Sequence, residues 1–205
     1  MNFKYAIFMI CIIILFSCKN PYFKDPQFNI SDIKLEALPV DESSVRFIGA
    51  FGIIIYPDKT MFHNGIDIGI KGGSAPFYSC ADGVVISVEY NTGAGLPGTS
   101  YRIRIKSSIK IEIEYGFETN NQVSEQEVKN NIFVKSGDFV KCGQKIANLL
   151  SFTDASHVHF GVKYENKTEN CPLNYFSDNI RKDFERIFDN VEKRPAYREN
   201  ICEWF

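Results

Sequence analysis

Two neighbouring segments alternate strictly between apolar and polar residues, and this pattern constrains the fold most. They read Y-R-I-R-I-K over residues 101–106 and I-K-I-E-I-E-Y over residues 109–115. A period of two places apolar side chains on one face of a strand and polar side chains on the other. Ser107 and Ser108 between the segments are candidates for a short turn. The pair therefore predicts two antiparallel strands, each with one buried and one solvated face.

Other segments carry the strand signal further along the chain. Residues 45–55 and 83–90 are rich in β-branched and aromatic residues, which favour strands. Residues 134–149 place paired glycine turns between short apolar segments, which is a hairpin pattern. The predicted fold class is mainly β, an antiparallel β-sheet domain over residues 44–165.

Polar segments and the composition complete this prediction. The stretches at residues 93–98 and 119–131 both predict loops. A chain of 205 residues is long enough for one domain with a substantial core, and a second full domain is not expected. The formal net charge of −2 offers no basic surface, so no binding to nucleic acid is predicted.

Residues 166–205 are predicted to form a C-terminal helical extension. Its apolar residues recur at helical spacing and so share one face: Ile180, Phe184, Ile187, Phe188 and Val191. Ser177 is the candidate N-cap, and Pro195 lies beyond the end of the pattern. The simplest interpretation is a helix that packs on the sheet, and a helix that binds a partner is the alternative.

Residues 1–17 have the pattern of a signal peptide. Lys4 precedes an apolar run at residues 6–16, which is too short to span a bilayer. The run ends in L-F-S-C, which resembles a lipoprotein signal in which cleavage precedes the cysteine and Cys18 is lipidated. A plain secretory signal or an uncleaved anchor is the alternative. Residues 18–43 are polar, carry prolines and predict a tether.

Export would place the remaining cysteines in an oxidising compartment. Four cysteines remain after Cys11 and Cys18 are set aside from the six in the chain, and they permit three disulfide pairings. The favoured pair is Cys171 with Cys202, because it would fasten the C-terminal segment. Cys80 and Cys142 would then pair with each other or remain buried free thiols.

The chain has three histidines, and all of them lie in two short motifs. His157 and His159 stand at i and i+2, so on a strand they project from the same face. His63 and Asp67 are separated by a turn at Gly65, where glycine would let the backbone bend and both side chains face one point. Two imidazoles and one carboxylate suffice for a catalytic zinc, which keeps its fourth position open. One histidine then remains for acid–base work.

These motifs resemble the signatures of the LytM/lysostaphin-type zinc endopeptidases. H-N-G-I-D-I-G is similar to their H-x-G-x-D motif, and S-H-V-H-F-G is similar to their H-x-H-F motif. Residues 75–85 and 134–147 also resemble the stretches that follow the first motif and precede the second. The similarity covers about residues 47–164. It implies an antiparallel β-sheet platform with a metal in a groove.

By position in the motifs, the resemblance implies one Zn²⁺ held by His63, Asp67 and His159. His157 would be a catalytic residue, either a general base toward the attacking water or a stabiliser of the oxyanion. The family cleaves peptide bonds of peptidoglycan, so a metalloendopeptidase acting on peptidoglycan peptides is implied. A lipoprotein anchored in the lipid bilayer and facing the periplasm or cell wall would meet that substrate. Lys19 favours the outer membrane if the cell has two.

The chain departs from the family pattern at a catalytic position, and Ile54 stands at about the place of an arginine that members often carry. Members carry a further histidine in a Y-x-H-L motif, and here Tyr115 and Gly116 fit but Phe117 stands at the histidine position. Loss of a positioned acid–base group typically costs about 10²–10⁴-fold in rate. Glu118 follows, but alternation along a strand would point it to the opposite face.

Three hypotheses remain at this stage. The chain is a zinc endopeptidase that works with His157 alone, or a catalytically impaired pseudo-peptidase. The second would keep its zinc and bind peptidoglycan or regulate another murein hydrolase. A β-rich lipoprotein without metal is the third, and it requires four motif residues to match by chance.

Overall fold

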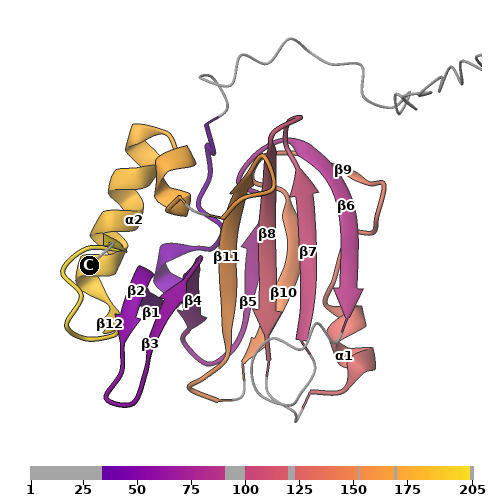
Figure 1. Ribbon diagram of the computed structural model, residues 1–205. Helices are drawn as coiled ribbons and strands as arrows, with labels where there is room; N and C mark the ends of the chain where they lie inside the picture. Colours follow the sequence, from indigo (N-terminus) through magenta and orange to yellow (C-terminus); the bar gives the residue numbers. More distant parts are fainter. Residues whose placement is uncertain (1–33, 91–99, 120–122, 152, 169, 204–205) are drawn as a thin grey trace, which may run out of the picture.

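The computed structural model describes residues 34–90, 100–119, 123–151, 153–168 and 170–203 (Figure 1). Strands dominate these residues and form one eight-stranded, one three-stranded and one two-stranded sheet. Most strand pairs are antiparallel, whereas β1 with β12 and β2 with β13 are parallel. The predicted mainly β, antiparallel fold class with a C-terminal helical extension is confirmed.

The eight-stranded sheet has the order β12-β1-β4-β11-β8-β7-β6-β9. In that order its strands are Glu192–Arg194, Val45–Gly49, Ile66–Ile70, His157–Tyr164, Ile111–Glu118, Ser100–Lys106, Gly83–Tyr90 and Phe139–Val140. Strand β11 lies between β8 and β4, although it follows both of them by many residues in the sequence. This insertion brings the two histidine motifs side by side.

The remaining elements flank this sheet. The two-stranded sheet pairs β5 (Gly73–Tyr78) with β10 (Lys145–Ser151), behind the large sheet in the view of Figure 1. The three-stranded sheet contains β13 (Cys202–Glu203), β2 (Phe51–Ile55) and β3 (Thr60–His63). The helices of the described residues are α1 (Glu125–Asn130), α2 (Asp178–Asn190) and two short 3₁₀ turns, η2 (Glu42–Ser44) and η3 (Pro172–Tyr175).

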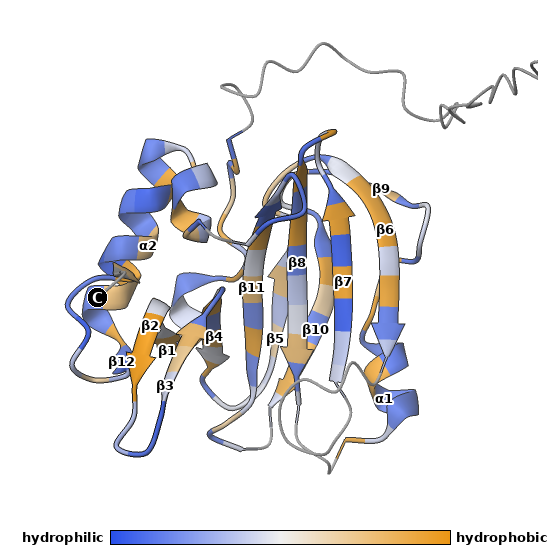
Figure 2. Cartoon of the chain, in the orientation of Figure 1, coloured by the Kyte–Doolittle hydropathy of each residue, from blue (hydrophilic) through white to orange (hydrophobic). Residues whose placement is uncertain are grey.

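The main core lies between the eight-stranded sheet and the β5–β10 pair. Phe117 of β8 stacks on Tyr101 of β7 with ring centroids 4.3 Å apart, and it meets Phe77 of β5 edge-on at 5.5 Å. All three rings are buried. The alternation in β7 and β8 produces this arrangement, and Figure 2 shows it as alternating colours along β7. Each buried aromatic ring stabilises the fold by about 1.5–3 kcal/mol through removal of apolar surface from water.

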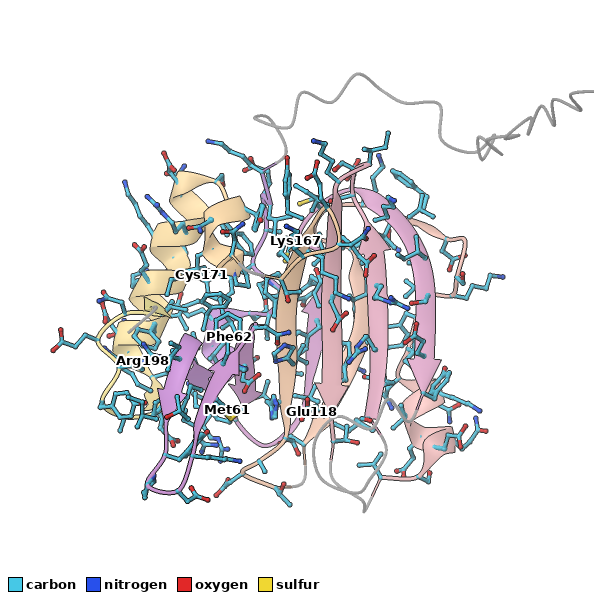
Figure 3. All side chains as sticks on the ribbon, viewed as in Figure 1. Met61, Phe62, Glu118, Lys167, Cys171 and Arg198 are labelled. Carbon is cyan, nitrogen blue, oxygen red and sulfur yellow. A yellow bond between two sulfur atoms is a disulfide. The ribbon has the colours of Figure 1, made fainter. Side chains whose placement is uncertain are left out.

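The opposite face of the eight-stranded sheet, toward the viewer in Figure 3, carries charged side chains. Glu114 lies 3.1 Å from the Nε of Arg102 and accepts a 2.7 Å hydrogen bond from the Nζ of Lys163. Arg104 pairs with Glu89 and lies 3.7 Å from Glu112. We call this set the charged ladder; its members are Glu89, Arg102, Arg104, Glu112, Glu114 and Lys163. Within it, each carboxylate has an Arg or Lys partner.

The short turn predicted between the alternating segments is present. It joins β7 to β8 as antiparallel neighbours, with Arg104 opposite Glu114. The hydroxyl oxygen of Ser108 accepts hydrogen bonds from the N–H groups of Lys110 and Ile111 at 3.2 and 3.0 Å. These bonds satisfy backbone donors at the turn and fix the register of the two strands.

Two predictions about the middle of the chain are wrong. Residues 119–131, predicted as a loop, include helix α1, where Ser124 and Glu127 form a capping box that satisfies backbone N–H groups. The hairpin predicted within residues 134–149 does not form, because β9 pairs with β6 and β10 pairs with β5. The glycine turns lead the chain from one sheet to the other. Residues 93–98, predicted as a loop, lie outside the described residues.

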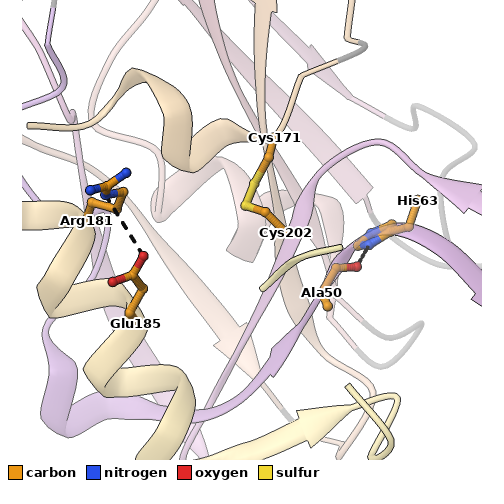
Figure 4. Close-up of a disulfide and its surroundings, with 6 residues drawn as sticks. All are labelled: Ala50, His63, Cys171, Arg181, Glu185 and Cys202. Carbon is orange, nitrogen blue, oxygen red and sulfur yellow. Dashed lines mark hydrogen bonds and ion pairs between the residues drawn. A yellow bond between two sulfur atoms is a disulfide. The ribbon is translucent and has the colours of Figure 1, made fainter. Parts of the chain in front are cut away.

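The C-terminal helix α2 follows Ser177 and packs on the domain. Its buried residues are Phe184, Ile187 and Phe188, three members of the predicted apolar stripe. A disulfide joins Cys171 to Cys202 and ties the segment before α2 to β13 (Figure 4). Cys80 and Cys142 are free thiols, so the second pairing considered from the sequence does not form.

The N-terminal predictions fall mostly outside the described residues, which begin at residue 34. Residues 34–43, assigned to the tether, pack against the domain. Leu35 is fully buried, and its N–H donates a 2.8 Å hydrogen bond to the carbonyl of Tyr175. Among the helices that the structure describes, none has the length and apolar character needed to cross a bilayer.

Candidate metal centre

The first motif places its two chemical groups on consecutive strands. His63 ends β3, and Asp67 lies in β4 on the other side of a short turn. The chain bends at Gly65, as predicted, although this glycine does not adopt a left-handed conformation. A Cβ at this position would lie 2.5 Å from both Cε1 and Nε2 of His159. Glycine is therefore needed here because the His159 ring approaches the backbone closely.

Strand β11 supplies the second motif. In the register with β4, His159 is opposite Asp67 and His157 is opposite Gly69. Both imidazoles point toward the same carboxylate, because residues two apart share one face of a strand. That face is the one that carries the charged ladder farther along β8 and β11.

Three donor atoms converge on one point. The Nε2 of His63 lies 3.1 Å from Oδ1 of Asp67 and 3.2 Å from Nδ1 of His159, and the last two atoms are 2.9 Å apart. Ligands about 2.0–2.1 Å from a tetrahedral zinc are separated from one another by roughly 3.3 Å. The triangle has nearly the size of one face of such a tetrahedron. These residues therefore fit a zinc ion.

A backbone carbonyl fixes the tautomer of His63. Its Nδ1 lies 2.6 Å from the carbonyl oxygen of Ala50 (Figure 4). Because a carbonyl only accepts hydrogen bonds, Nδ1 carries the proton and donates it. In the neutral ring, Nε2 keeps the lone pair that a metal would accept, and a ring protonated on both nitrogens donates from Nε2 to Asp67. Hydrogen bonds of this kind orient histidines that ligate metals.

The electrostatics of the cluster favour a charged Asp67. Burial alone would raise the pKa of this carboxyl group, but hydrogen bonds from His159 and His63 hold the pKa well below its usual range. Burial alone would lower the pKa of His63, but its contacts with Asp67 raise the pKa above 6.5. The carboxylate thus stabilises positive charge at the point where the three donor atoms meet.

His157 lies beside the triangle without belonging to it. Its Nδ1 is 2.8 Å from the carbonyl of Ala155, so Nδ1 donates and the ring is held in place. Its Nε2 is 3.6 Å from Oδ1 of Asp67 and 3.4 Å from Oε2 of Glu118. The side chain is 18% exposed. A group that approaches the triangle along the open face can therefore reach this imidazole.

Phe117 and Glu118 have orientations opposite to those predicted. Phe117 faces the core, whereas Glu118 faces the site from the end of β8 (Figure 3). Tyr115 fixes this phase of the strand, because its buried hydroxyl oxygen accepts a hydrogen bond from the N–H of Cys80 at 2.9 Å. The prediction that Glu118 points away from the site is wrong because it took Phe117 to face the site.

Sequence reasoning missed Glu118 as a site residue, although the signal was present. Along β8 the polar residues occupy even-numbered positions, at Glu112, Glu114 and Glu118. The alternation that predicted the strand also predicts which face each of its residues takes. Alignment with the family motif instead put Phe117 at the position of a catalytic histidine, so its side chain was predicted to face the site.

The chain matches one known protein family. Residues 61–171 match the profile described as Peptidase family M23, and this range includes His63, Asp67, His157 and His159. Among solved structures, a zinc containing peptidase from Vibrio cholerae is 28% identical and has a TM-score of 0.44. The match covers 63% of this chain and 38% of that chain, so it spans less than half of the other protein. Comparison with curated proteins gives no match.

Proposed function

The chain belongs to peptidase family M23, and from this premise we propose that it is a zinc-dependent endopeptidase that hydrolyses peptide bonds of peptidoglycan. Membership supports a metallopeptidase. The observation that carries the proposal is the triangle of His63, Asp67 and His159, whose donor atoms lie 2.9–3.2 Å apart. A further imidazole stands next to this triangle on the open face of the sheet.

The donor set has the composition of a catalytic rather than a structural zinc site. His63 and His159 would each give one nitrogen, and Asp67 would give one oxygen. Three protein ligands leave a coordination position for water or substrate, whereas structural sites use four. A zinc ion held there supplies a Lewis acid that polarises a carbonyl and lowers the pKa of water to about 7.

His157 provides the protein's own contribution beside the metal. Its Nδ1 is occupied by the carbonyl of Ala155, so Nε2 is the ring atom directed at the site. From this position the neutral imidazole accepts a proton from the attacking water, and the ring that has gained this proton donates a hydrogen bond to the carbonyl oxygen as negative charge develops. A positioned acid–base group contributes about 10²–10⁴-fold in rate, and an oxyanion donor contributes about 10²–10³-fold.

Glycine residues leave the open face accessible to an extended peptide. Gly116 lies opposite His159 in the register of β8 and β11, and Gly161 follows two residues later on β11. Neither residue projects a side chain over the ligands on the open face. A peptide backbone can thus approach the three donor atoms from this side.

The proposed substrate requires an exported protein. The N-terminal pattern that ends at Cys18 supports a lipoprotein anchored in a bilayer, with its domain toward the periplasm or cell wall. Lys19 supports the outer membrane where two membranes exist. Mass spectrometry of the mature N-terminus tests this part, since a lipidated Cys18 must be the first residue. Release of a Cys18→Ala variant from the membrane fraction is also expected.

A digest of cell-wall sacculi tests the activity. The full chain in detergent is incubated with purified sacculi and zinc, and soluble fragments are identified by mass spectrometry beside a His63→Ala control. Fragments with new peptide termini are expected from the wild type and not from the control. Absence of fragments from a wild-type protein that holds one zinc per chain would contradict the proposal.

A catalytically impaired pseudo-peptidase is the second candidate function. The observation in its favour is that two of the three histidines in the chain are assigned to the metal, which leaves His157 alone. This candidate predicts that the zinc-loaded protein sediments with sacculi but releases nothing. The same digest therefore separates the two functions.

A further inference from the structure

We propose that Glu118 is the second acid–base residue of this site and works beside His157. The inference rests on the proposed peptidase function and deepens it. The family motif assigns the missing histidine to Phe117, whereas the geometry assigns the vacant role to its neighbour.

The position of Glu118 is set by the register of two strands. It lies directly opposite His157, while Phe117 lies opposite Val158 in the core. The Oε2 of Glu118 is 3.4 Å from Nε2 of His157, and the same nitrogen is 3.6 Å from Oδ1 of Asp67. A carboxylate and an imidazole thus stand together at the side of the ligand triangle.

Glu118 also differs from the other carboxylates on its strand face. Glu112 and Glu114 pair with Arg104, Arg102 and Lys163 of the charged ladder. Among the ion pairs of the described residues, Glu118 is joined only to His157. A carboxylate held by Arg has its lone pairs engaged. The lone pairs of Glu118 are free to take a proton, and its side chain is 17% exposed.

The proposed step balances with water as the only co-reactant. Glu118 takes a proton from water while the water oxygen forms a bond to the carbonyl carbon of the scissile peptide. At this stage His157, with protons on both ring nitrogens, donates a hydrogen bond from Nε2 to the carbonyl oxygen. The C–N bond then breaks, Glu118 returns the proton to the leaving nitrogen, and the products are a carboxylic acid and an amine. The carboxylate of Glu118 is regenerated.

The central test compares Glu118→Gln with Glu112→Gln in the full chain. Gln keeps the size of the side chain but cannot take the proton. For Glu118→Gln we expect kcat for release from labelled sacculi to fall by about 10²–10⁴-fold, with KM changed by no more than a few-fold. Glu112→Gln, on the same strand face, is expected to behave as the wild type. Zinc affinity, measured by competition with a chelator, should be unchanged in both variants.

Two further variants compare the motif position with the structural position. Glu118→His places an imidazole in the groove and is expected to recover part of the activity lost in Glu118→Gln. Phe117→His places an imidazole between the rings of Tyr101 and Phe77. The expected result there is a lower Tm and no activity above that of the wild type.

Each outcome has a definite meaning. Wild-type kcat in Glu118→Gln overturns the inference and leaves the peptidase intact. A tenfold or greater loss of zinc affinity in that variant makes Glu118 a metal ligand and also overturns it. If the wild type releases no fragments but the Glu118→His variant does, Glu118 inactivates the site, and the inference is overturned. If no zinc-loaded protein, wild type or variant, releases fragments, the proposed function itself has failed, and the inference fails with it.

Discussion

The open face of the eight-stranded sheet has two ends that use similar residue types in opposite ways. At the charged ladder, Glu112 and Glu114 lie 2.7–3.7 Å from Arg and Lys side chains. At the metal centre, Asp67 and Glu118 face imidazoles instead. Strands β8 and β11 run through both ends, so the backbone scaffold is shared.

The two ends differ in how the charge of their carboxylates is neutralised. The ladder is neutralised by its own cations. At the metal centre, no Arg or Lys ion pair involves Asp67 or Glu118 among the described residues. Two carboxylates and three imidazoles then share a small region, and a divalent cation bound there would neutralise the carboxylate charge. The ladder contributes rigidity, and the metal centre is suited to chemistry.

Substitution of a metal ligand should give the largest difference in zinc affinity between variants at the two ends. His159→Ala deletes one corner of the triangle, so zinc affinity is expected to fall by more than about 100-fold, beyond the loss typical of residues that only orient ligands. Lys163→Ala on the same strand face is the control and should change zinc affinity less than threefold. Competition with a chelator measures both. Equal losses in the two variants would remove the distinction between the ends.

Truncation beneath the face should affect stability rather than metal binding. Phe117→Ala deletes a buried ring that contacts Tyr101 and Phe77, so the free energy of unfolding is expected to fall by about 3–5 kcal/mol. Glu118→Ala on the site side should cost less than about 1 kcal/mol. Urea denaturation of the metal-free proteins measures both. A smaller loss for Phe117→Ala than for Glu118→Ala would contradict the assigned orientations.

Glycine substitutions at the two ends should also differ in their effect on zinc affinity. Gly65→Ala would place a Cβ 2.5 Å from the His159 ring and displace it, so zinc affinity is expected to fall by about 10–100-fold. Gly161→Ala at the ladder end places its Cβ 3.9 Å from Glu114, which is an ordinary contact. Calorimetric zinc titration of the two variants checks this. Unchanged affinity in Gly65→Ala would mean that the ring can move without cost.

A break in the ladder should have the smallest effect. Arg104→Gln removes the partner of Glu89 and Glu112, whose side chains are partly exposed, so unfolding is expected to become easier by less than about 1 kcal/mol. Zinc affinity should not change. Thermal unfolding at low and high salt measures the effect, which should shrink as salt screens the pairs. A loss of zinc affinity would instead show that the two ends are coupled.

Local sequence patterns predicted the parts of the molecule that repeat regularly. The alternation at residues 101–115 specified β7 and β8, and the three- and four-residue spacing specified α2. The same period of two predicted that His157 and His159 share a face. The prediction that these histidines lie close to His63 and Asp67 came from the motif resemblance. A local pattern could not supply it, because the insertion of β11 between β8 and β4 depends on tertiary contacts.

Other features depended on partners that a local pattern does not reveal. Strand β12 has only three residues, and it exists because it pairs with β1 in parallel. Strands β9 and β10 resembled a hairpin, but β9 pairs with β6 and β10 pairs with β5, in two different sheets. Helix α1 was missed even though its capping box, Ser124 with Glu127, is legible in the sequence. The alternation along β8 also indicates which face of the strand Phe117 and Glu118 occupy. The prediction followed the family motif instead and was wrong.

X-ray absorption at the zinc edge of the zinc-loaded full chain tests the central claim most directly. The account predicts one zinc per chain with nitrogen and oxygen scatterers at about 2.0–2.2 Å, including two imidazoles, and no sulfur. The His63→Ala variant should lose this spectrum. A sulfur shell at about 2.3 Å would place the ion at the free thiols of Cys80 and Cys142 instead, and would contradict the assignment of the site.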